Sequence, residues 1–365
     1  MSRQKRPRAI TVGGALIDTI AVIGAESIER ISMTNAHRAF LLLEQGSKTE
    51  AEIVSTHPGG GALNAAVSFA RLGFETATLI KIGNDDRGYA VRKRLADEKI
   101  SDEFVVTAPQ SPTGASVLIS AHDRNAAIFT FRGANTLLEN SDLPERAFAR
   151  DIVYVAGLSD KSADCFPEIA RLAGAAGAFV ATNPGIRQLT SRGDAFEDSL
   201  RNIDLLCLNV REIEALVLRL FVRLGTSAKL RAEKPALCGP DIRNGSVTMP
   251  LNDVFRGLLD LGAKCVVVTD GKRGAYAAVA GEVSFCPALP LEVIGTAGAG
   301  DAFNSTFTAF YGTGSSAAES LQAATVNSGS VVMSPDTQTG LLTKERLIAE
   351  LKSSSSTLKV EVSPL

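Results

Sequence analysis

Residues 295–303 read GTAGAGDAF: small residues and glycines crowd the chain just before one carboxylate, Asp301, and an apolar helical pattern follows. Backbone without bulky side chains can turn its N–H groups toward an anion, and the positive end of the helix dipole adds to this attraction. A carboxylate in that position can accept a proton beside an anionic group as it is transferred. The alternative is a tight strand-to-helix turn in which Asp301 stabilises the N-terminus of the helix.

The bulk composition allows one large domain or a domain with a smaller appendage. The chain has 365 residues, 45% of them hydrophobic, and a formal net charge of −2 with acids and bases mixed along its length. This balance predicts no nucleic-acid partner, and no stretch is long and apolar enough to predict a membrane span. The five cysteines are widely spaced and predict neither a zinc site nor a disulfide framework. We therefore expect a cytoplasmic protein that acts on a small molecule.

Short apolar runs alternate with helical patterns over most of the chain. Continuous apolar strands between helices indicate a mostly parallel sheet that is covered on both faces. The sequence therefore predicts an α/β fold with three layers, α/β/α, around one central sheet. The expected strands are 10–12, 78–82, 152–155, 179–182, 205–208 and 265–269, and the expected helices are 62–72, 87–97, 212–224, 302–310, 317–332 and 343–352.

Two segments, roughly 28–57 and 104–131, interrupt this alternation. In the second segment, residues 115–120 and 127–131 flank a turn and predict an antiparallel hairpin. Together with a strand near 51–54, the hairpin predicts a small separate sheet that forms a lid over an active site. The alternative is an extension of the edge of the main sheet.

A polar segment over residues 226–252 contains three prolines. This composition predicts a long surface insertion before the helix that ends near residue 261. The chain shows no internal repeat, and residues 1–365 are expected to form a single domain.

A second glycine cluster covers Gly59, Gly60 and Gly61, and Asn64 follows it in the next predicted helix. The backbone can approach a ligand closely where no Cβ obstructs it, and the amide of Asn64 offers a donor and an acceptor to hydroxyl groups. Alternatively, the glycines only turn the chain and Asn64 caps the helix. Asp18 comes just after the first predicted strand, where open α/β sheets bind ligands, and could accept two hydrogen bonds from neighbouring sugar hydroxyls.

Two further motifs follow predicted strands. Asn209 and Glu212 lie three residues apart and so share one helix face, which suits water-mediated Mg²⁺ binding near phosphates. The same pair is equally an N-terminal helix cap. Thr269, Gly271 and Gly274 belong to a glycine-spaced turn that can cover a nucleotide, and ordinary turns share this composition.

The order of these motifs is far more specific than any one of them. The GG…N helix start at 59–64 comes first, NxxE at 209–212 second, TxGxxG at 269–274 third and GAGD at 298–301 last. In this order the chain resembles the ribokinase-like, or PfkB, family of carbohydrate kinases over roughly residues 10–352. The resemblance implies a three-layer α/β core and a small β-sheet lid, which in many members also forms a dimer interface. It also implies Mg²⁺-dependent transfer of a phosphoryl group from ATP to a hydroxymethyl group.

The resemblance further implies roles for individual residues. Asp301 matches the catalytic base of the family, and Gly298, Ala299 and Gly300 match its anion hole. The positions that match the sugar-binding loop and its contacts are Asp18, Gly60, Gly61 and Asn64. The positions that match ATP contacts are Asn209, Glu212, Thr269, Gly271, Gly274 and Asn327, of which Glu212 is also linked to Mg²⁺.

Three positions depart from the pattern of the family. Gly295 replaces an aspartate beside the loop that binds a monovalent cation, which leaves open whether K⁺ activates the protein. Gly61 replaces the usual lysine, and Leu16 the usual asparagine, of the ribokinase sugar site, and both changes remove polar contacts to ribose. Arg132 could instead approach the phosphate or carboxylate of an acidic sugar, or it could form a salt bridge on the lid surface.

Three hypotheses follow from these features. The leading one is an ATP-dependent kinase for a sugar or related polyol, with a homodimer that forms through the lid. The second is a nucleoside kinase of the same fold, because Leu16 suits an apolar ligand and Phe129 and Phe131 could stack on a base. The third, prompted by Gly295, is a catalytically weak ligand-binding protein, and the intact glycine nest with Asp301 argues against it.

Overall fold

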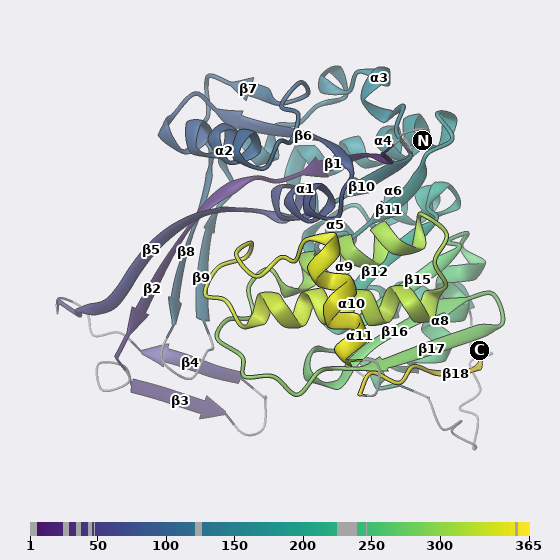
Figure 1. Ribbon diagram of the computed structural model, residues 1–365. Helices are drawn as coiled ribbons and strands as arrows, with labels where there is room; N and C mark the ends of the chain where they lie inside the picture. The colour runs from purple at the N-terminus through teal and green to yellow at the C-terminus, as the bar shows by residue number, and fades with distance from the viewer. Residues whose placement is uncertain are drawn as a thin grey trace.

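The central layer of the molecule is a ten-stranded sheet (Figure 1). The residues described by the computed structural model are 6–24, 29–33, 38–42, 46, 48–120, 126–224, 239–245, 247–354 and 357–365. Across the sheet the strands follow the order β18 (Glu361–Pro364), β17 (Glu282–Pro287), β16 (Gly274–Val279), β15 (Cys265–Thr269), β12 (Leu205–Asn209), β11 (Phe179–Thr182), β10 (Ile152–Val155), β1 (Arg8–Gly13), β6 (Glu75–Gly83) and β7 (Val106–Ala108). Neighbouring strands from β7 to β15 run parallel, and β16, β17 and β18 continue the sheet antiparallel. The predicted mostly parallel sheet is therefore confirmed.

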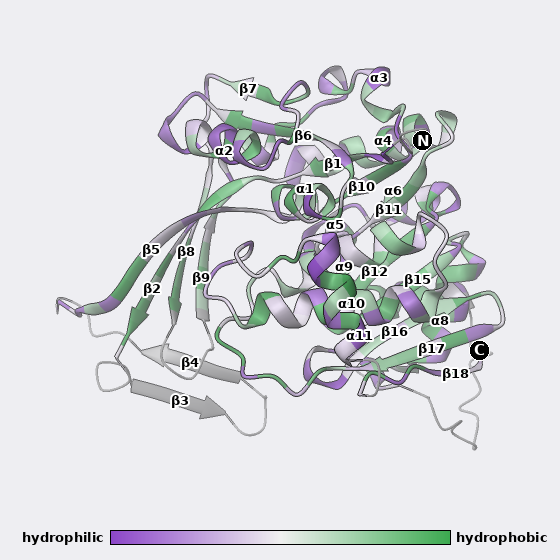
Figure 2. Ribbon diagram, viewed as in Figure 1, coloured by the Kyte–Doolittle hydropathy of each residue, from purple (hydrophilic) through white to green (hydrophobic). Residues whose placement is uncertain are grey.

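Helices cover both faces of this sheet, as the three-layer prediction requires. One face carries α1 (Gly61–Arg71), α2 (Asp86–Asp97), α9 (Ala299–Tyr311), α10 (Ala317–Val332) and α11 (Lys344–Ser354), and the other carries α3 (Glu145–Phe148), α4 (Phe166–Ala175), α5 (Ile186–Ser191), α6 (Gly193–Ser199), α7 (Val210–Leu224) and α8 (Leu251–Asp260). Successive strand residues point to opposite faces, so β1 sends Ile10 and Val12 into one hydrophobic core and Ala9 into the other. The central strands are hydrophobic on both faces (Figure 2), which is typical of a buried parallel sheet.

A second, four-stranded sheet forms the lid, and it extends away from the central layers (Figure 1). Its strand order is β5 (Ala51–Gly59), β2 (Leu16–Ile23), β8 (Gly114–Ser120) and β9 (Ala126–Phe131). The expected hairpin is present as the antiparallel pair β8–β9, and β2 pairs antiparallel with β5 and parallel with β8. The short strands β3 (Glu29–Met33) and β4 (Arg38–Leu42) form a separate two-stranded sheet.

The lid differs from the expected segments 28–57 and 104–131 in two ways. Its strand β2 lies before residue 28, whereas β7, inside 104–131, pairs with β6 in the main sheet. Asp18 consequently lies within a lid strand and not in a loop after the first strand. The chain leaves β1 at Gly13 and enters β2 at Leu16, and this early change from one sheet to another has no local sequence signal beyond the glycines.

The expected insertion over 226–252 is only partly described, because residues 225–238 lie outside the described ranges. Its remaining part is a hairpin of β13 (Asp241–Asn244) and β14 (Val247–Pro250), and α8 already begins at Leu251. Ile242 and Met249 of this hairpin are fully buried, so the described part is anchored to the core and is not a surface loop.

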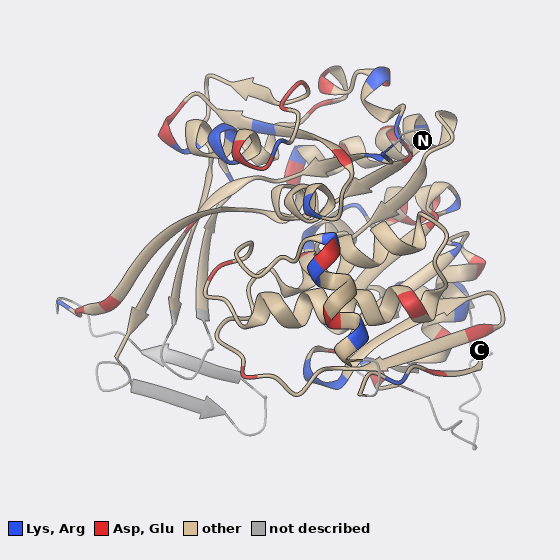
Figure 3. Ribbon diagram, viewed as in Figure 1, with Lys and Arg blue, Asp and Glu red and all other residues tan. Residues whose placement is uncertain are grey.

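Lys and Arg residues alternate with Asp and Glu residues along the ribbon of the described chain (Figure 3). None of the helices that the structure describes combines the length and the apolar character needed to cross a bilayer.

Candidate active site

The predicted glycine nest forms the N-terminus of α9. It follows the loop 288–298, so the nest is not a direct strand-to-helix turn. Gly298 precedes the helix with φ +78°, and a Cβ there would come within 2.6 Å of the Thr337 side chain. The N–H groups of residues 299–301 have no acceptor within their own helix, and that of Ala299 lies a long 3.4 Å from the carbonyl of Thr296. This end of α9 is therefore suited to bind an anion.

The Asp301 carboxyl group lies in the first turn of α9 and faces the glycine loop before α1. Its Oδ2 accepts a hydrogen bond from Asn64 Nδ2 at 2.8 Å, and its Oδ1 lies 3.5 Å from the point where a Cβ on Gly61 would be. Burial raises the pKa of Asp301, the Asn64 hydrogen bond lowers it, and the charge of Asp18 raises it further. Asp18 therefore lies close enough to Asp301 for its negative charge to disfavour ionisation of Asp301.

Asp18 extends from the lid strand β2 into this site. Its Oδ1 accepts a hydrogen bond from Ser116 Oγ on β8, and a Cβ on Gly59 would lie only 2.1 Å from its Oδ2. Burial raises the pKa of Asp18, whereas the Ser116 hydrogen bond and the neighbouring His57 lower it. Ser116 and His57 stand opposite Asp18 on β8 and β5. They were not predicted from the sequence, because the register of the lid sheet decides these neighbours.

Asn64 is more constrained than its predicted role as a sugar contact implies. It lies in α1, which begins after Gly60 at φ +100°, and its side chain is buried. Its Oδ1 accepts from Thr337 Oγ1 at 3.0 Å and from Gln338 Nε2 at 2.9 Å, while its Nδ2 donates to Asp301. Both lone-pair positions of Oδ1 are then occupied, so Asn64 can offer a ligand only its remaining N–H and not an acceptor.

Asn209 and Glu212 form a reciprocal cap at the start of α7. The backbone N–H of Asn209 donates to Glu212 Oε2 at 2.9 Å, and the N–H of Glu212 donates to Asn209 Oδ1 at 2.9 Å. Asn183 Nδ2, after β11, also lies 3.2 Å from Glu212 Oε2 and was not identified from the sequence. Burial raises the pKa of Glu212 to about 7, the bonds from Asn209 and Asn183 oppose this, and the charge of Asp301 adds to it.

The Glu212 carboxylate, but not the N–H groups that donate to it, fits a Mg²⁺ ion that also binds phosphates. Among the described residues, no three His, Cys, Asp or Glu side chains come together as a metal site. Magnesium commonly keeps several waters and takes one or two protein carboxylates together with substrate phosphates. The single buried carboxylate of Glu212 matches that pattern and does not match a metal held by protein ligands alone.

Replacement of Glu212 is expected to stabilise the unliganded protein in a pH-dependent way. Since the folded-state pKa is about 7 and the ordinary value is 4.5, ionisation of Glu212 favours unfolding. The resulting loss in the free energy of unfolding is absent below pH 4.5. It grows between pH 4.5 and pH 7 and reaches roughly 3 kcal/mol above pH 7. Glu212→Gln should therefore raise the free energy of unfolding in urea at pH 8 but not at pH 4.5.

A matched control is Glu319→Gln, which removes an exposed carboxylate that caps α10. Hydrogen bonds to Ser316 lower the pKa of Glu319, so this variant should lose stability at pH 8. An equal gain from Glu212→Gln at both pH values would contradict the assigned pKa.

A cavity of about 590 Å³ adjoins the glycine nest. Its lining includes Thr269, Gly271 and Gly274 of the turn after β15 and Ala299 and Gly300 of α9. Apolar side chains line it as well, among them Leu289, Leu291, Val293, Phe303 and Val332. A ligand that carries both an anionic group and an apolar group fits this lining.

Asn327, expected from the resemblance to contact ATP, does not line this cavity. Its side chain is fully buried, its Nδ2 donates to Thr306 Oγ1 at 2.7 Å, and its Oδ1 accepts from the backbone N–H of Leu342 at 2.9 Å. The next two residues of α10, Ser328 and Gly329, line the cavity instead. Successive side chains of a helix point about 100° apart. A shift of one residue along α10 therefore separates a side chain that faces the core from one that faces the cavity.

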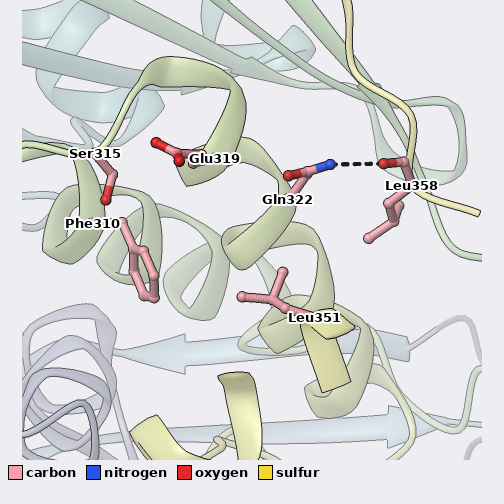
Figure 4. A pocket seen from close by; sticks show the side chains of 6 residues that line it. All are labelled: Phe310, Ser315, Glu319, Gln322, Leu351 and Leu358. Atoms are coloured by element: carbon pink, nitrogen blue, oxygen red, sulfur yellow. Dashed lines mark hydrogen bonds between the residues drawn. The ribbon is translucent and has the colours of Figure 1, made fainter. Parts of the chain in front are cut away.

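A smaller cavity of about 240 Å³ lies near the C-terminal end of α9 (Figure 4). Gln322 of α10 borders it and donates to the carbonyl of Leu358 at 2.8 Å. None of the residues predicted from the sequence to form the site lines this cavity, so it is separate from the residues around Asp301.

The sequence and the fold both match known proteins. The pfkB family carbohydrate kinase profile matches residues 18–344. A fructokinase from Klebsiella pneumoniae is 30% identical over 254 residues, which cover 67% of this chain and 74% of the fructokinase. The structure of ribokinase from Arabidopsis thaliana complexed with ribose and ATP matches with a TM-score of 0.71 at 19% identity, over 95% of this chain and 99% of that one. Adenosine kinase from Sinorhizobium meliloti matches in fold with a TM-score of 0.71 at 20% identity and the same coverage.

Proposed function

Since this chain belongs to the pfkB family of carbohydrate kinases, we propose that it transfers the γ-phosphate of ATP to a hydroxymethyl group of a sugar or related polyol. The observation that carries the proposal is the position of Asp301. Its carboxylate lies between Asp18 and Gly59–Gly61 on one side and the N-terminal amides of α9 on the other. An acceptor on the first side and a phosphate on the second would meet at this carboxylate.

In the proposed reaction the acceptor oxygen attacks the γ-phosphorus while its proton passes to Asp301. The bond from the γ-phosphorus to the bridging oxygen breaks, and ADP leaves. The backbone N–H groups at 298–300 stabilise the charge on the transferred group. Glu212 would hold Mg²⁺ through water, and this ion would neutralise phosphate charge. The proposed reaction has no step that needs K⁺, and Gly295 supplies no carboxylate for a monovalent cation.

The geometry of the lid favours a sugar over a nucleoside. Phe129 and Phe131 flank Thr130, which stands opposite Ser116 in the sheet. Since neighbouring strand residues point to opposite faces, both rings lie on the face away from Asp18 and Ser116. They cannot stack on a base that is bound beside Asp18.

The decisive experiment is a screen for ADP release. Purified protein with Mg-ATP is offered neutral sugars, sugar acids, sugar phosphates and nucleosides, with the Asp301→Asn variant as the blank. We expect a sugar or polyol to stimulate ADP release and nucleosides to have little effect. Stimulation by nucleosides alone would favour the second hypothesis, and no stimulation by any acceptor would favour a ligand-binding protein.

Replacement of Gly59 by alanine is expected to weaken acceptor binding selectively. The new Cβ would lie 2.1 Å from Asp18 Oδ2, so the carboxylate must leave its hydrogen bond with Ser116. Loss of one or two hydrogen bonds to a charged group predicts a KM for the acceptor that rises roughly 10- to 100-fold. The KM for ATP should stay within about twofold. An unchanged acceptor KM would remove Asp18 from the acceptor site.

We also propose that two copies of the chain pair through the outer face of the lid sheet. Val54, Val117, Phe129 and Phe131 share that face and are 42% to 65% exposed. A group of exposed hydrophobic side chains on one sheet face favours association. Light scattering after gel filtration should give a dimer, and Phe129→Ser should give a monomer, whereas Val222→Ser on α7 should change nothing. A monomeric parent protein would contradict this proposal.

A further inference from the structure

The segment after α10 contributes side chains to the surroundings of Asp301, although it contains none of the predicted motifs. Thr337 and Gln338 are buried, and both donate to Asn64 Oδ1. Asn64 in turn donates to Asp301. The segment therefore reaches the carboxylate through one intervening side chain.

The two ends of the Asn64 amide are not equivalent at this position. If the amide turned over, its oxygen would face the Asp301 carboxylate and its N–H₂ would face the N–H₂ of Gln338. Both contacts would then be repulsive, whereas the Thr337 hydroxyl can donate to the oxygen or accept from the N–H₂. The hydrogen bond from Gln338 therefore decides, together with Asp301, which end of the amide faces the carboxylate.

The side-chain amide of Gln338 could also face Asn64 with either its oxygen or its N–H₂, and a charged residue determines which. Arg94 Nε, from α2, donates to Gln338 Oε1 at 2.7 Å. A guanidinium group carries only donors, so the oxygen of Gln338 must face Arg94 and its N–H₂ must face Asn64. The backbone of Gln338 is held as well, because its N–H donates to Asp336 Oδ1 at 2.8 Å and its carbonyl accepts from Arg71 Nη1 at 2.8 Å.

These contacts form a chain of hydrogen bonds with a single direction. It runs from Arg94 through Gln338 and Asn64 to Asp301, with a cation at one end and a carboxylate at the other. Successive hydrogen bonds of this kind polarise one another, and each one restrains the orientation of the next group. Asp301 Oδ2 is thereby occupied, and Oδ1 is left to accept a proton.

We propose that Gln338, held by Arg94, is a positioning residue for the catalytic base: it fixes the Asn64 amide so that Asp301 keeps one oxygen hydrogen-bonded and the other free for the acceptor hydroxyl. This inference rests on the proposed function. It assigns a role to α2 and to the 336–338 segment, which do not line the 590 Å³ cavity.

The first test is the variant Gln338→Leu, which removes the donor and keeps a similar volume. We expect kcat to fall roughly 10- to 100-fold, as is typical when a group that orients a catalytic ligand is lost. The KM values for ATP and for the acceptor should change less than about threefold. The lower pH limit of kcat should move to higher pH, because the ionised form of Asp301 loses an oriented donor. The other ionisable groups that act electrostatically on Asp301 are Asp18 on β2, Glu212 on α7 and Tyr154 on β10, which stay in place.

A double-mutant cycle separates positioning from a general loss of packing. In an Asn64→Ala background, Gln338→Leu should have almost no further effect on kcat, because the group that it orients is gone. Gln338→Glu gives a second variant of nearly unchanged shape. It keeps the contact with Arg94 but turns a donor into an acceptor, so it should lower kcat at least as much as leucine does.

The matched control is Gln322→Leu, which removes another glutamine hydrogen bond far from Asp301. It should leave kcat and its pH profile unchanged. The proposal is overturned if Gln338→Leu and Gln338→Glu both keep kcat within twofold, or if their losses persist in full in the Asn64→Ala background. The proposed function fails separately, if no sugar or polyol stimulates ADP release by the parent protein.

Discussion

Replacement of Asp301 by asparagine is expected to lower kcat roughly 10³-fold while the protein keeps its fold and binds both substrates. General base catalysis by a positioned side chain contributes about 10²- to 10⁴-fold, and asparagine cannot accept the proton at neutral pH. The variant can still accept the hydrogen bond from Asn64, so the surrounding contacts remain. Steady-state kinetics for kcat, with binding of ATP and acceptor measured by calorimetry, separates these effects.

The same substitution should not destabilise the protein. Burial and the charge of Asp18 raise the pKa of Asp301, so its ionisation favours unfolding at any pH above its ordinary value of 3.8. Asparagine removes this penalty, and we expect an equal or higher melting temperature at pH 7. Asp86→Asn, at the exposed start of α2, is the control for loss of a helix-terminal carboxylate and should leave kcat unchanged. Normal turnover of Asp301→Asn would remove Asp301 from its role as the base.

Gly300→Ala is expected to lower kcat/KM for ATP about 10²-fold without destabilising the protein. The new Cβ would have no heavy atom within 4 Å, so the folded chain accommodates it. Gly300 lines the 590 Å³ cavity, however, and the methyl group would occupy space that the phosphates need. A displacement of about 1 Å at a reacting group can cost 10²-fold in rate. Alanine also has the higher helix propensity, which predicts a gain of up to about 1 kcal/mol in the free energy of unfolding.

Two further glycines provide the controls for this prediction. Gly174→Ala, in α4, places a Cβ at an ordinary contact distance of 4.0 Å from Asn202 Cβ and should gain stability with no change in activity. Gly298→Ala should instead lose stability, because its φ is +78° and the Cβ would come within 2.6 Å of Thr337. If Gly300→Ala retains full kcat/KM for ATP, the phosphates do not lie against this end of α9.

The central fold and the glycine-rich loops could be predicted from local patterns in the sequence. Apolar runs such as 205–208 and 265–269 became buried parallel strands, and a helix begins at Ala299, among the glycines that precede Asp301. Asn209 and Glu212 meet because three residues make almost one helical turn. In each case the residues involved are near neighbours in the chain, so spacing alone brings them together.

Elsewhere a local pattern left the position of a side chain undecided. Asn327 lies in a helix that was predicted, yet it faces the core, and Ser328 and Gly329 face the cavity. Asp18 was expected just after the first strand of the main sheet and lies in a lid strand, since nothing nearby indicated that the chain enters a second sheet after Gly13. Packing against distant elements decides which residue of a helix faces a cavity and which sheet a strand joins.

By itself, the sequence determined that this chain forms a parallel α/β sheet with a carboxylate at a glycine-rich helix start, because hydrophobic periodicity and backbone freedom are local properties. Only the tertiary structure decided which groups surround that carboxylate. Asn64 meets Asp301 across 237 positions, and Gln338 meets Asn64 across 274. Contacts at such separations depend on how whole helices and sheets pack, and on the pairing of donors with acceptors in the buried space between them.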